Sequence, residues 1–132
     1  MNPSIRGSAV SGRIWPGGRY VDAVGSTMIN FGGKKLYGIV RFAPRLRALR
    51  WQYGKPVVIT EANTAFGVRI RWLKDFRRML RSMPWIRAVA WSQLPSRGKA
   101  HLSGVGNVNW DVQRDPRSAA LLRAIIRDGV RR

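Results

Sequence analysis

Three segments of the chain are rich in apolar and β-branched residues, and we expect each of them to form a strand. They span residues 20–32, 56–63 and 86–94. Their apolar residues follow one another almost without interruption. This pattern is typical of strands that are covered on both faces of a parallel sheet.

Apolar residues recur at helical spacing in the stretches that follow these strands. One stripe, with apolar residues between Ile39 and Tyr53, predicts a helix that has Pro44 in its first turn, where a proline is tolerated. A second stripe predicts a helix over 68–83, with basic residues on its other faces. The stretch "DPRSAALLRAII" predicts a third helix, with Asp115 as its cap and Pro116 at its first helical position.

Strand and helix thus alternate three times along the chain. The strands begin about 30–36 residues apart, the length of one strand with its helix. Three such units in a row favour an α/β fold with a parallel sheet. A chain of 132 residues suits a single domain, which we assign to 14–132 with 1–13 as an N-terminal tail. The segment 95–114 predicts a long loop, and long loops in compact domains are usually functional or mobile.

The charge is the most unusual part of the composition. The 25 lysine and arginine residues outweigh six aspartate and glutamate residues, so the net charge is +19. The arginines are spread over every segment, which fits a coding bias as well as it fits contacts with a polyanion. No apolar run reaches the roughly 18 residues of a membrane span. No secretory signal is visible near the N-terminus, so the sequence assigns no location.

Polar and aromatic residues mark the ends of the predicted strands. In parallel α/β folds, functional groups collect at the carboxyl ends of the strands. These ends carry Asn30 on the first strand, Glu61 on the second, and Trp91 and Gln93 on the third. Trp110 lies in the long loop. Tryptophan rings in such places stack on sugars or on bases. Together, the residues named at the strand ends and Trp110 form a candidate site of five residues.

Glu61 is the main candidate for chemistry, because it directly follows the apolar residues "VVIT" and precedes the loop-like "ANT". A glutamate in that position serves as a nucleophile, a general base or a metal ligand. It equally fits a structural role, paired with one of the many arginines. Its position alone leaves both roles open.

Other chemistries have little support in the sequence. No G-x-S-x-G motif accompanies His101, the single histidine, which argues against a Ser-His-Asp triad. The sequence has no cysteine, no H-x-x-x-H pattern and no acidic cluster for a metal site. Its paired glycines lack the spacing of a phosphate-binding loop. We therefore expect no metal ion and no cofactor.

Four stretches, taken in order, resemble glycoside hydrolase family 26, the β-mannanase-like family of (β/α)8 barrels. The resemblance covers residues from about 14 to 127 and implies that the three units correspond to strands six to eight of a TIM barrel. It implies that Glu61 is the catalytic nucleophile, Trp91 a sugar-stacking platform and Asn30 a polar contact at the rim. The four stretches are "WPGGRYVDAVGSTMINFG", "YGKPVVITEANTA", "WLKDFRRMLRSMPWIRAVAWSQ" and "NWDVQRDPRSAALLRAI".

The same resemblance implies what this chain lacks. The family's acid/base glutamate lies on the fourth strand, and no segment here corresponds to strands one to five. Gly18, Ile29 and Ser92 stand where the family has an aspartate, a tyrosine and a phenylalanine. We expect a fragment that binds or acts on a β-linked polysaccharide such as mannan and is inactive alone. It would self-associate or pair with a missing N-terminal half-barrel. Family members are often secreted or attached to the cell envelope.

A non-enzymatic alternative stays open. The chain would then be a basic α/β module whose arginine-rich helix faces bind nucleic acid or another polyanion. Because the arginines are scattered rather than gathered in one arm or stripe, nucleic acid is the less favoured partner.

Overall fold

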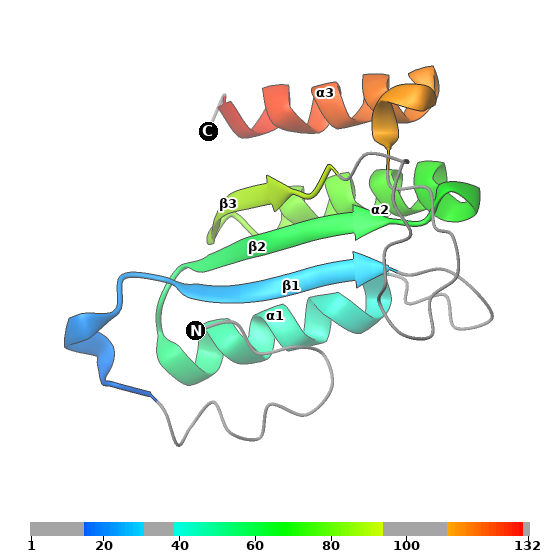
Figure 1. Ribbon diagram of the computed structural model, residues 1–132. Coiled ribbons are helices and arrows are strands. Elements are labelled where there is room, and N and C mark those ends of the chain that lie inside the picture. Colours follow the sequence, from blue (N-terminus) through cyan, green and yellow to red (C-terminus); the bar gives the residue numbers. More distant parts are fainter. Residues whose placement is uncertain (1–14, 31–38, 94–110, 131–132) are drawn as a thin grey trace.

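A parallel sheet of three strands, alternating with helices, makes up the body of the protein. A computed structural model describes residues 15–30, 39–93 and 111–130 (Figure 1). The strand order is β1-β2-β3, so β2 is the central strand and both of its neighbours run parallel to it. The strands are β1 (Val24–Asn30), β2 (Val57–Thr64) and β3 (Ile86–Trp91).

One helix follows each strand in the chain. These helices are α1 (Ile39–Tyr53), α2 (Arg69–Ser82) and α3 (Pro116–Val130). The described residues also contain three short 3-10 helices: η1 (Gly18–Tyr20), η2 (Phe66–Val68) and η3 (Val112–Arg114). The predicted α/β fold with a parallel sheet is confirmed, and the described residues form no closed barrel. The predicted tail, 1–13, and most of the predicted loop lie outside the described residues.

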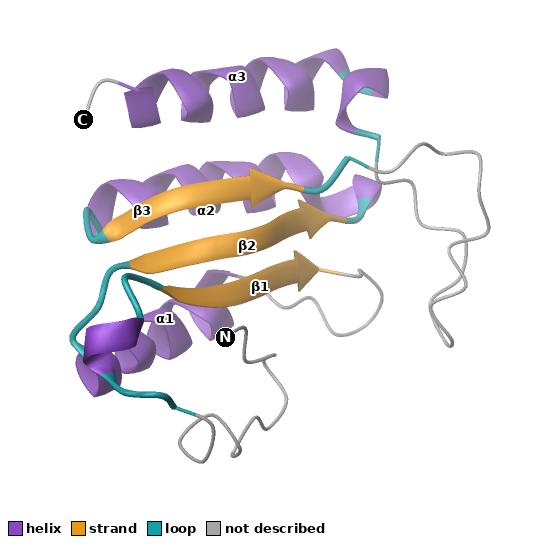
Figure 2. Cartoon of the chain, turned by 60° about the vertical axis from the view of Figure 1, so that its left-hand side comes forward, coloured by secondary structure: helices purple, strands orange, loops and turns teal. Residues whose placement is uncertain are grey.

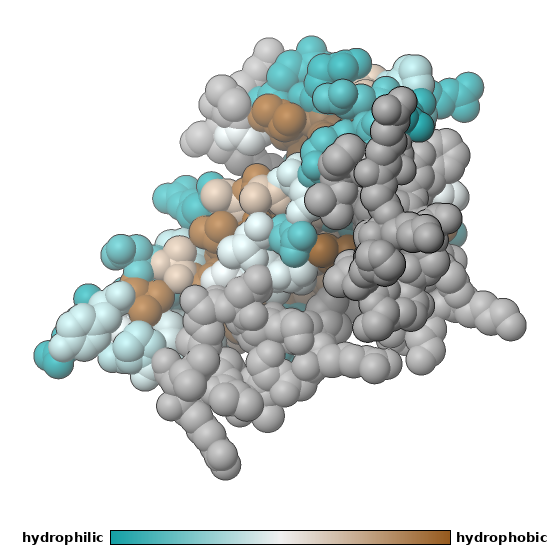
Figure 3. All heavy atoms as spheres, viewed as in Figure 1, coloured by the Kyte–Doolittle hydropathy of each residue, from teal (hydrophilic) through white to brown (hydrophobic). Residues whose placement is uncertain are grey.

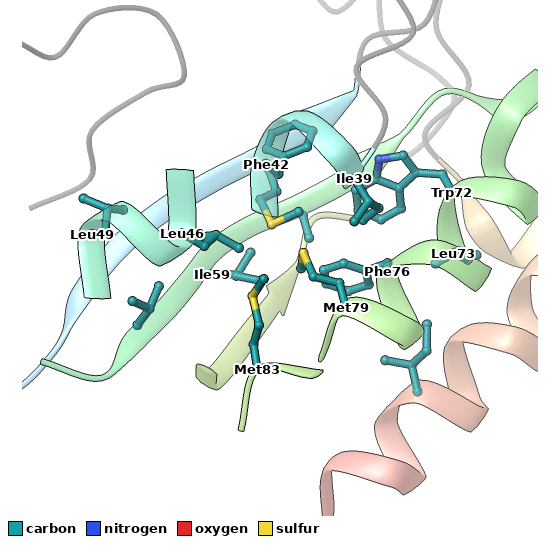
Figure 4. Close-up of a cluster of buried hydrophobic side chains, with 14 residues drawn as sticks. Ile39, Phe42, Leu46, Leu49, Ile59, Trp72, Leu73, Phe76, Met79 and Met83 are labelled. Atoms are coloured by element: carbon teal, nitrogen blue, oxygen red, sulfur yellow. The ribbon is translucent and has the colours of Figure 1, made fainter. Parts of the chain in front are cut away.

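The hydrophobic core lies between the sheet and the helices α1 and α2, which both cover the same face (Figure 2). The two helices contribute most of the buried side chains, and on α2 the rings of Trp72 and Phe76 are stacked with their centroids 4.8 Å apart. The strands contribute β-branched and sulfur-containing side chains from their helix-facing positions. The residues labelled in Figure 4 include Ile39, Phe42, Leu46, Leu49, Ile59, Leu73, Met79 and Met83.

Pro44 lies in the interior of α1, and the prediction that it falls in the first turn is wrong. The helix already begins by Ile39, so Pro44 is at least its sixth residue. A proline there cannot bond to the carbonyl oxygen of Val40. Val40 is 82% exposed and Pro44 is exposed as well. Pro44 therefore lies on the solvent-facing side of α1, away from the core.

The start of α3 is as predicted. Asp115 caps the helix, because its carboxylate accepts a hydrogen bond from the backbone N–H of Arg117 at 3.2 Å and another from the Ser118 hydroxyl. The bond from Ser118 is the main reason that the pKa of Asp115 is lowered from its ordinary value. Pro116 is the first helical residue.

The carboxylate of Asp128 links α3 to α2. Asp128 accepts a hydrogen bond from Arg77 Nε at 2.8 Å and pairs with Arg81 at 3.0 Å. The bond from Arg77 is the main reason that the pKa of Asp128 falls to about 2. Ile125 adds an apolar contact to the core. None of the helices that the structure describes is long and apolar enough to cross a lipid bilayer.

We predict that the stability of the fold depends on the ionisation of Asp128. Because its folded-state pKa is below the ordinary value of about 3.9, the carboxylate stabilises the fold above about pH 4 and loses this effect as the pH falls toward 2. Asp128→Asn should therefore lower the Tm near neutral pH and leave it unchanged near pH 2, as followed by circular dichroism.

The matched control is Asp75→Asn, which removes the exposed pair with Arg78. Exposed pairs of this kind contribute little, so its Tm should stay close to that of the unaltered protein at every pH. A Tm difference for Asp128→Asn that stayed constant from neutral pH down to about pH 2 would contradict the assignment.

Candidate functional site at the carboxyl end of the sheet

An extra residue in the central strand sets the direction in which Glu61 points. Ser26 of β1 pairs with Ile59, but the next residue, Thr27, pairs with Glu61, so Thr60 has no partner in β1. Relative to β3 the central strand also has one extra residue between Ile59 and Ala62. Thr60 is therefore the extra residue of a β-bulge. A bulge turns the side chains that follow it to the other face of the sheet.

The bulge keeps a carboxylate out of the hydrophobic core. Side chains alternate between faces along a regular strand, so Ile59 and Glu61, which are two residues apart, would share one face if the strand had no bulge at Thr60. Ile59 is fully buried in the core under the helices. After the bulge, Ala62 takes the core-facing position instead. Glu61 thus points to the face away from α1 and α2, which we call the second face.

Glu61 is half-buried on the second face and is held by a hydroxyl group of the neighbouring strand. The Ser92 hydroxyl donates a hydrogen bond to Glu61 Oε1 at 3.0 Å. No lysine or arginine of the described ranges forms an ion pair with this carboxylate. The structural role considered from the sequence, pairing with an arginine, is thus not observed in this part of the chain.

Asn63 ties the ends of β2 and β3 together beside Glu61. Its side-chain amide donates a hydrogen bond to the backbone oxygen of Ser92, and its Oδ1 accepts one from the backbone N–H of Thr64 at 2.7 Å. Asn63 is 1% exposed. These bonds hold Ser92, and through its hydroxyl the carboxylate of Glu61, in a defined position.

Two of the predicted site residues point to the helix side instead. Asn30 is buried and donates a hydrogen bond to Thr64 Oγ1 at 3.0 Å, on the same face as Met28 of the core. The ring of Trp91 packs edge-on against Trp72 of α2, with centroids 6.2 Å apart. The structure therefore does not bring Asn30 and Trp91 to the face that carries Glu61.

Gln93 lies at the carboxyl end of the sheet and joins it to the segment before α3. Its side-chain amide donates a hydrogen bond to Asp111 Oδ1 at 2.6 Å. The same carboxylate accepts the backbone N–H of Gln113 at 2.9 Å and pairs with Arg114 at 3.3 Å. Both oxygens of Asp111 are thus engaged. Trp110, the fifth predicted site residue, lies outside the described residues.

Arg69, at the first position of α2, was not singled out from the sequence. It is 0% exposed, and it donates hydrogen bonds to the backbone oxygens of Thr64 at 3.3 Å and of Asp111 at 2.9 Å. Burial lowers the pKa of Arg69, and the nearby charges of Asp115 and Asp111 act in the opposite direction. One guanidinium group therefore links the end of β2 to the segment that leads into α3.

All six side-chain carboxylates of the chain lie within the described residues. Asp22 precedes β1, at the opposite end of the sheet from Glu61, and Asp75 and Asp128 lie on helices. Asp111 and Asp115 are engaged in caps. The described ranges contain no group of three or more histidine, cysteine, aspartate or glutamate residues that could hold a metal ion. Glu61 is thus the carboxylate that faces the carboxyl end of the central strand.

Comparison with known proteins assigns no family. No protein-family model matches the chain, and no curated protein is significantly similar to it.

We predict that Arg69 is required for stability far more than its exposed neighbours are. Arg69→Met removes the hydrogen bonds that this buried side chain donates to two backbone oxygens, which should cost about 1–3 kcal/mol of unfolding free energy. Arg71→Met, two residues further along on the exposed face of α2, should change it by less than about 0.5 kcal/mol. Urea unfolding measures both, and equal losses for the two variants would refute the linking role of Arg69.

Proposed function

We propose that the chain is a glycoside hydrolase-like segment that binds a β-linked polysaccharide, with Glu61 as a nucleophile. The observation that carries the proposal is the direction of Glu61. A bulge turns it out of the core at the carboxyl end of the central parallel strand, and Ser92 holds it there without a neutralising cation among the described residues. Functional groups gather at this end of parallel α/β sheets.

The resemblance to glycoside hydrolase family 26 supports the same proposal. The three parallel strands and their helices have the connectivity that strands six to eight of a (β/α)8 barrel would have. In that arrangement β2 would be the seventh strand, and its glutamate the nucleophile. A mannan-like β-linked polysaccharide is the substrate class that the resemblance suggests.

The chemistry needs a second carboxyl group. In a retaining hydrolase, a carboxylate oxygen attacks the anomeric carbon to form a glycosyl ester, while the bond from that carbon to the leaving oxygen breaks. The leaving oxygen takes its proton from an acid whose carboxyl group lies about 5–5.5 Å from the nucleophile. Asp111 is committed to its three donors. We therefore propose that this chain alone binds sugar but hydrolyses natural substrates weakly or not at all.

An activated substrate separates the role of Glu61 from the need for an acid. A dinitrophenolate leaving group departs without a proton, so a dinitrophenyl 2-deoxy-2-fluoro-β-mannoside should form a stable ester with Glu61. Mass spectrometry of the intact protein and of its peptides should find one label, on Glu61. Glu61→Gln should abolish the label, and Asp111→Asn, which alters the other carboxylate near this end, should keep it.

Two results would contradict this proposal. A label on another residue would show that Glu61 is not the nucleophile. If no label formed and calorimetry detected no binding of β-linked manno-oligosaccharides, a β-linked mannan would be excluded as the ligand. If oligosaccharide binding survived without labelling, the chain would be a binding module and not a hydrolase-like one.

A second function is supported by the exposed face of α2. Arg71, Lys74 and Arg78 are spaced three and four residues apart, so they lie on one side of the helix, and all three are exposed. With a net charge of +19, this basic stripe suits the backbone of a nucleic acid or another polyanion.

The salt dependence of binding tests this second function. If the three side chains contact phosphates, the slope of log affinity against log salt for double-stranded DNA should become shallower by about three units when all three are changed to alanine. The control changes Arg117, Arg123 and Arg127 of α3 to alanine and removes the same charge. Equal changes in slope for both triple variants would mean that net charge alone, and no site on α2, attracts the polyanion.

A further inference from the structure

The helix layer extends further than the sheet that it covers. β3 is an edge strand of the described sheet, yet α3 lies on the far side of it (Figure 1). The main contacts of α3 are with α2 and η3. In layered α/β structures a helix covers strands, but the described residues place no strand under this part of α3.

A groove occupies the space that such a strand would fill. It has a volume of about 540 Å³ and lies between β3, α2 and α3. Most residues of β3 are exposed or half-buried, and Ile126 of α3 is 56% exposed. Figure 3 shows apolar residues between α3 and the sheet and hydrophilic residues on the outer side of α3. The apolar lining includes Leu80, Ile86, Val89, Leu122, Ile125 and Ile126.

The charged residues of the groove are mainly positive. Arg77, Arg81 and Arg87 line it together with one carboxylate, that of Asp128. Asp128 already pairs with both Arg77 and Arg81, so it compensates for only one of their two charges. Arg87 is exposed on the edge strand itself. The groove therefore has an apolar floor with an excess of guanidinium groups around it.

We propose that this groove binds an extended, acidic segment of a partner protein, which adds to the sheet as a strand beside β3. An edge strand offers unpaired backbone groups that such a segment can bond to. Alternate side chains of an added strand would point under α3, where apolar residues would be buried against Leu122 and Ile126. Acidic side chains of the segment would lie near the exposed Arg87 of the edge strand and in the positive field of Arg77 and Arg81.

Charge argues against a second copy of this chain as the occupant. Edge-to-edge pairing of two copies would bring two basic grooves together and oppose two net charges of +19. An acidic segment removes this repulsion and gains attraction at the same site. The proposal does not depend on the chemistry of Glu61, which lies at another part of the sheet.

Binding of short labelled peptides to the full chain tests the proposal. The probe is a peptide of about eight residues that alternates valine and glutamate, long enough for one strand. It should bind with a measurable change in fluorescence anisotropy. A peptide with lysine in place of glutamate, and an acidic peptide with prolines that cannot donate strand hydrogen bonds, should both bind about tenfold more weakly or worse.

Variants with matched controls locate the binding site. Arg87→Glu should weaken binding of the acidic peptide about tenfold and strengthen binding of the lysine peptide. Arg47→Glu, an exposed position on α1 with the same change in net charge, should alter both affinities much less. Ile126→Glu should weaken binding of the acidic peptide, whereas Val40→Glu, on an exposed apolar residue of α1, should not.

Three outcomes would overturn the proposal. The first is that the proline-containing acidic peptide binds as tightly as the probe, since only charge would then be recognised. The second is that Arg47→Glu weakens binding as much as Arg87→Glu does. The third is a dimer in sedimentation that Ile126→Glu dissociates, because the groove would then be occupied by a second copy.

Discussion

The pairing of β2 with a parallel strand on each side is the constraint on which the rest of the structure depends. It buries the central strand, positions α1 and α2 over one face, and brings the ends of three separate segments to one edge. The hydrogen bonds from Ser92 to Glu61, from Asn63 to Ser92 and from Asn30 to Thr64 each join the ends of strands that this pairing places side by side. The bond from Ser92 to Glu61 exists because β2 and β3 are in register at Ala62 and Trp91.

A second level of organisation comes from polar groups that are buried with partners. Asn63 and Asn30 each bond to the end of a neighbouring strand, and Arg69 reaches from α2 to the segment before α3. Buried groups of this kind are costly unless they are paired. Their partners therefore restrict the carboxyl edge of the sheet to one arrangement, and this edge is where Glu61 lies.

The fold could be predicted from the sequence because burial leaves a strong pattern. The continuous apolar runs of the three strands and the helical stripes between them indicated the α/β architecture, and the Asp115-Pro116 pair indicated the start of α3. Pro44 could not be placed in its turn, because a stripe of apolar residues does not mark the first residue of a helix. The apolar pattern by itself does not show the exposure of β3 either, since an apolar run looks the same at the edge of a sheet and at its centre.

The candidate site was predictable only in part, for a similar reason. Glu61 was found because a lone carboxylate at the end of an apolar strand is unusual. The side on which Asn30 and Trp91 lie follows from strand register, which the sequence does not show. Ser92 looked like an ordinary polar residue, and Arg69 was one among many arginines. What distinguishes both is the bonds that they make in three dimensions.

The extra residue at Thr60 determines how the strand would respond to the loss of a single codon. Without Thr60, Ile59 and Glu61 would follow one another in a regular strand and would still point to opposite faces, so the carboxylate would stay outside the hydrophobic core. A gene encoding this strand could therefore lose the three nucleotides of that codon and keep the carboxylate on its side of the sheet, whereas the same loss one codon later would remove the carboxylate itself.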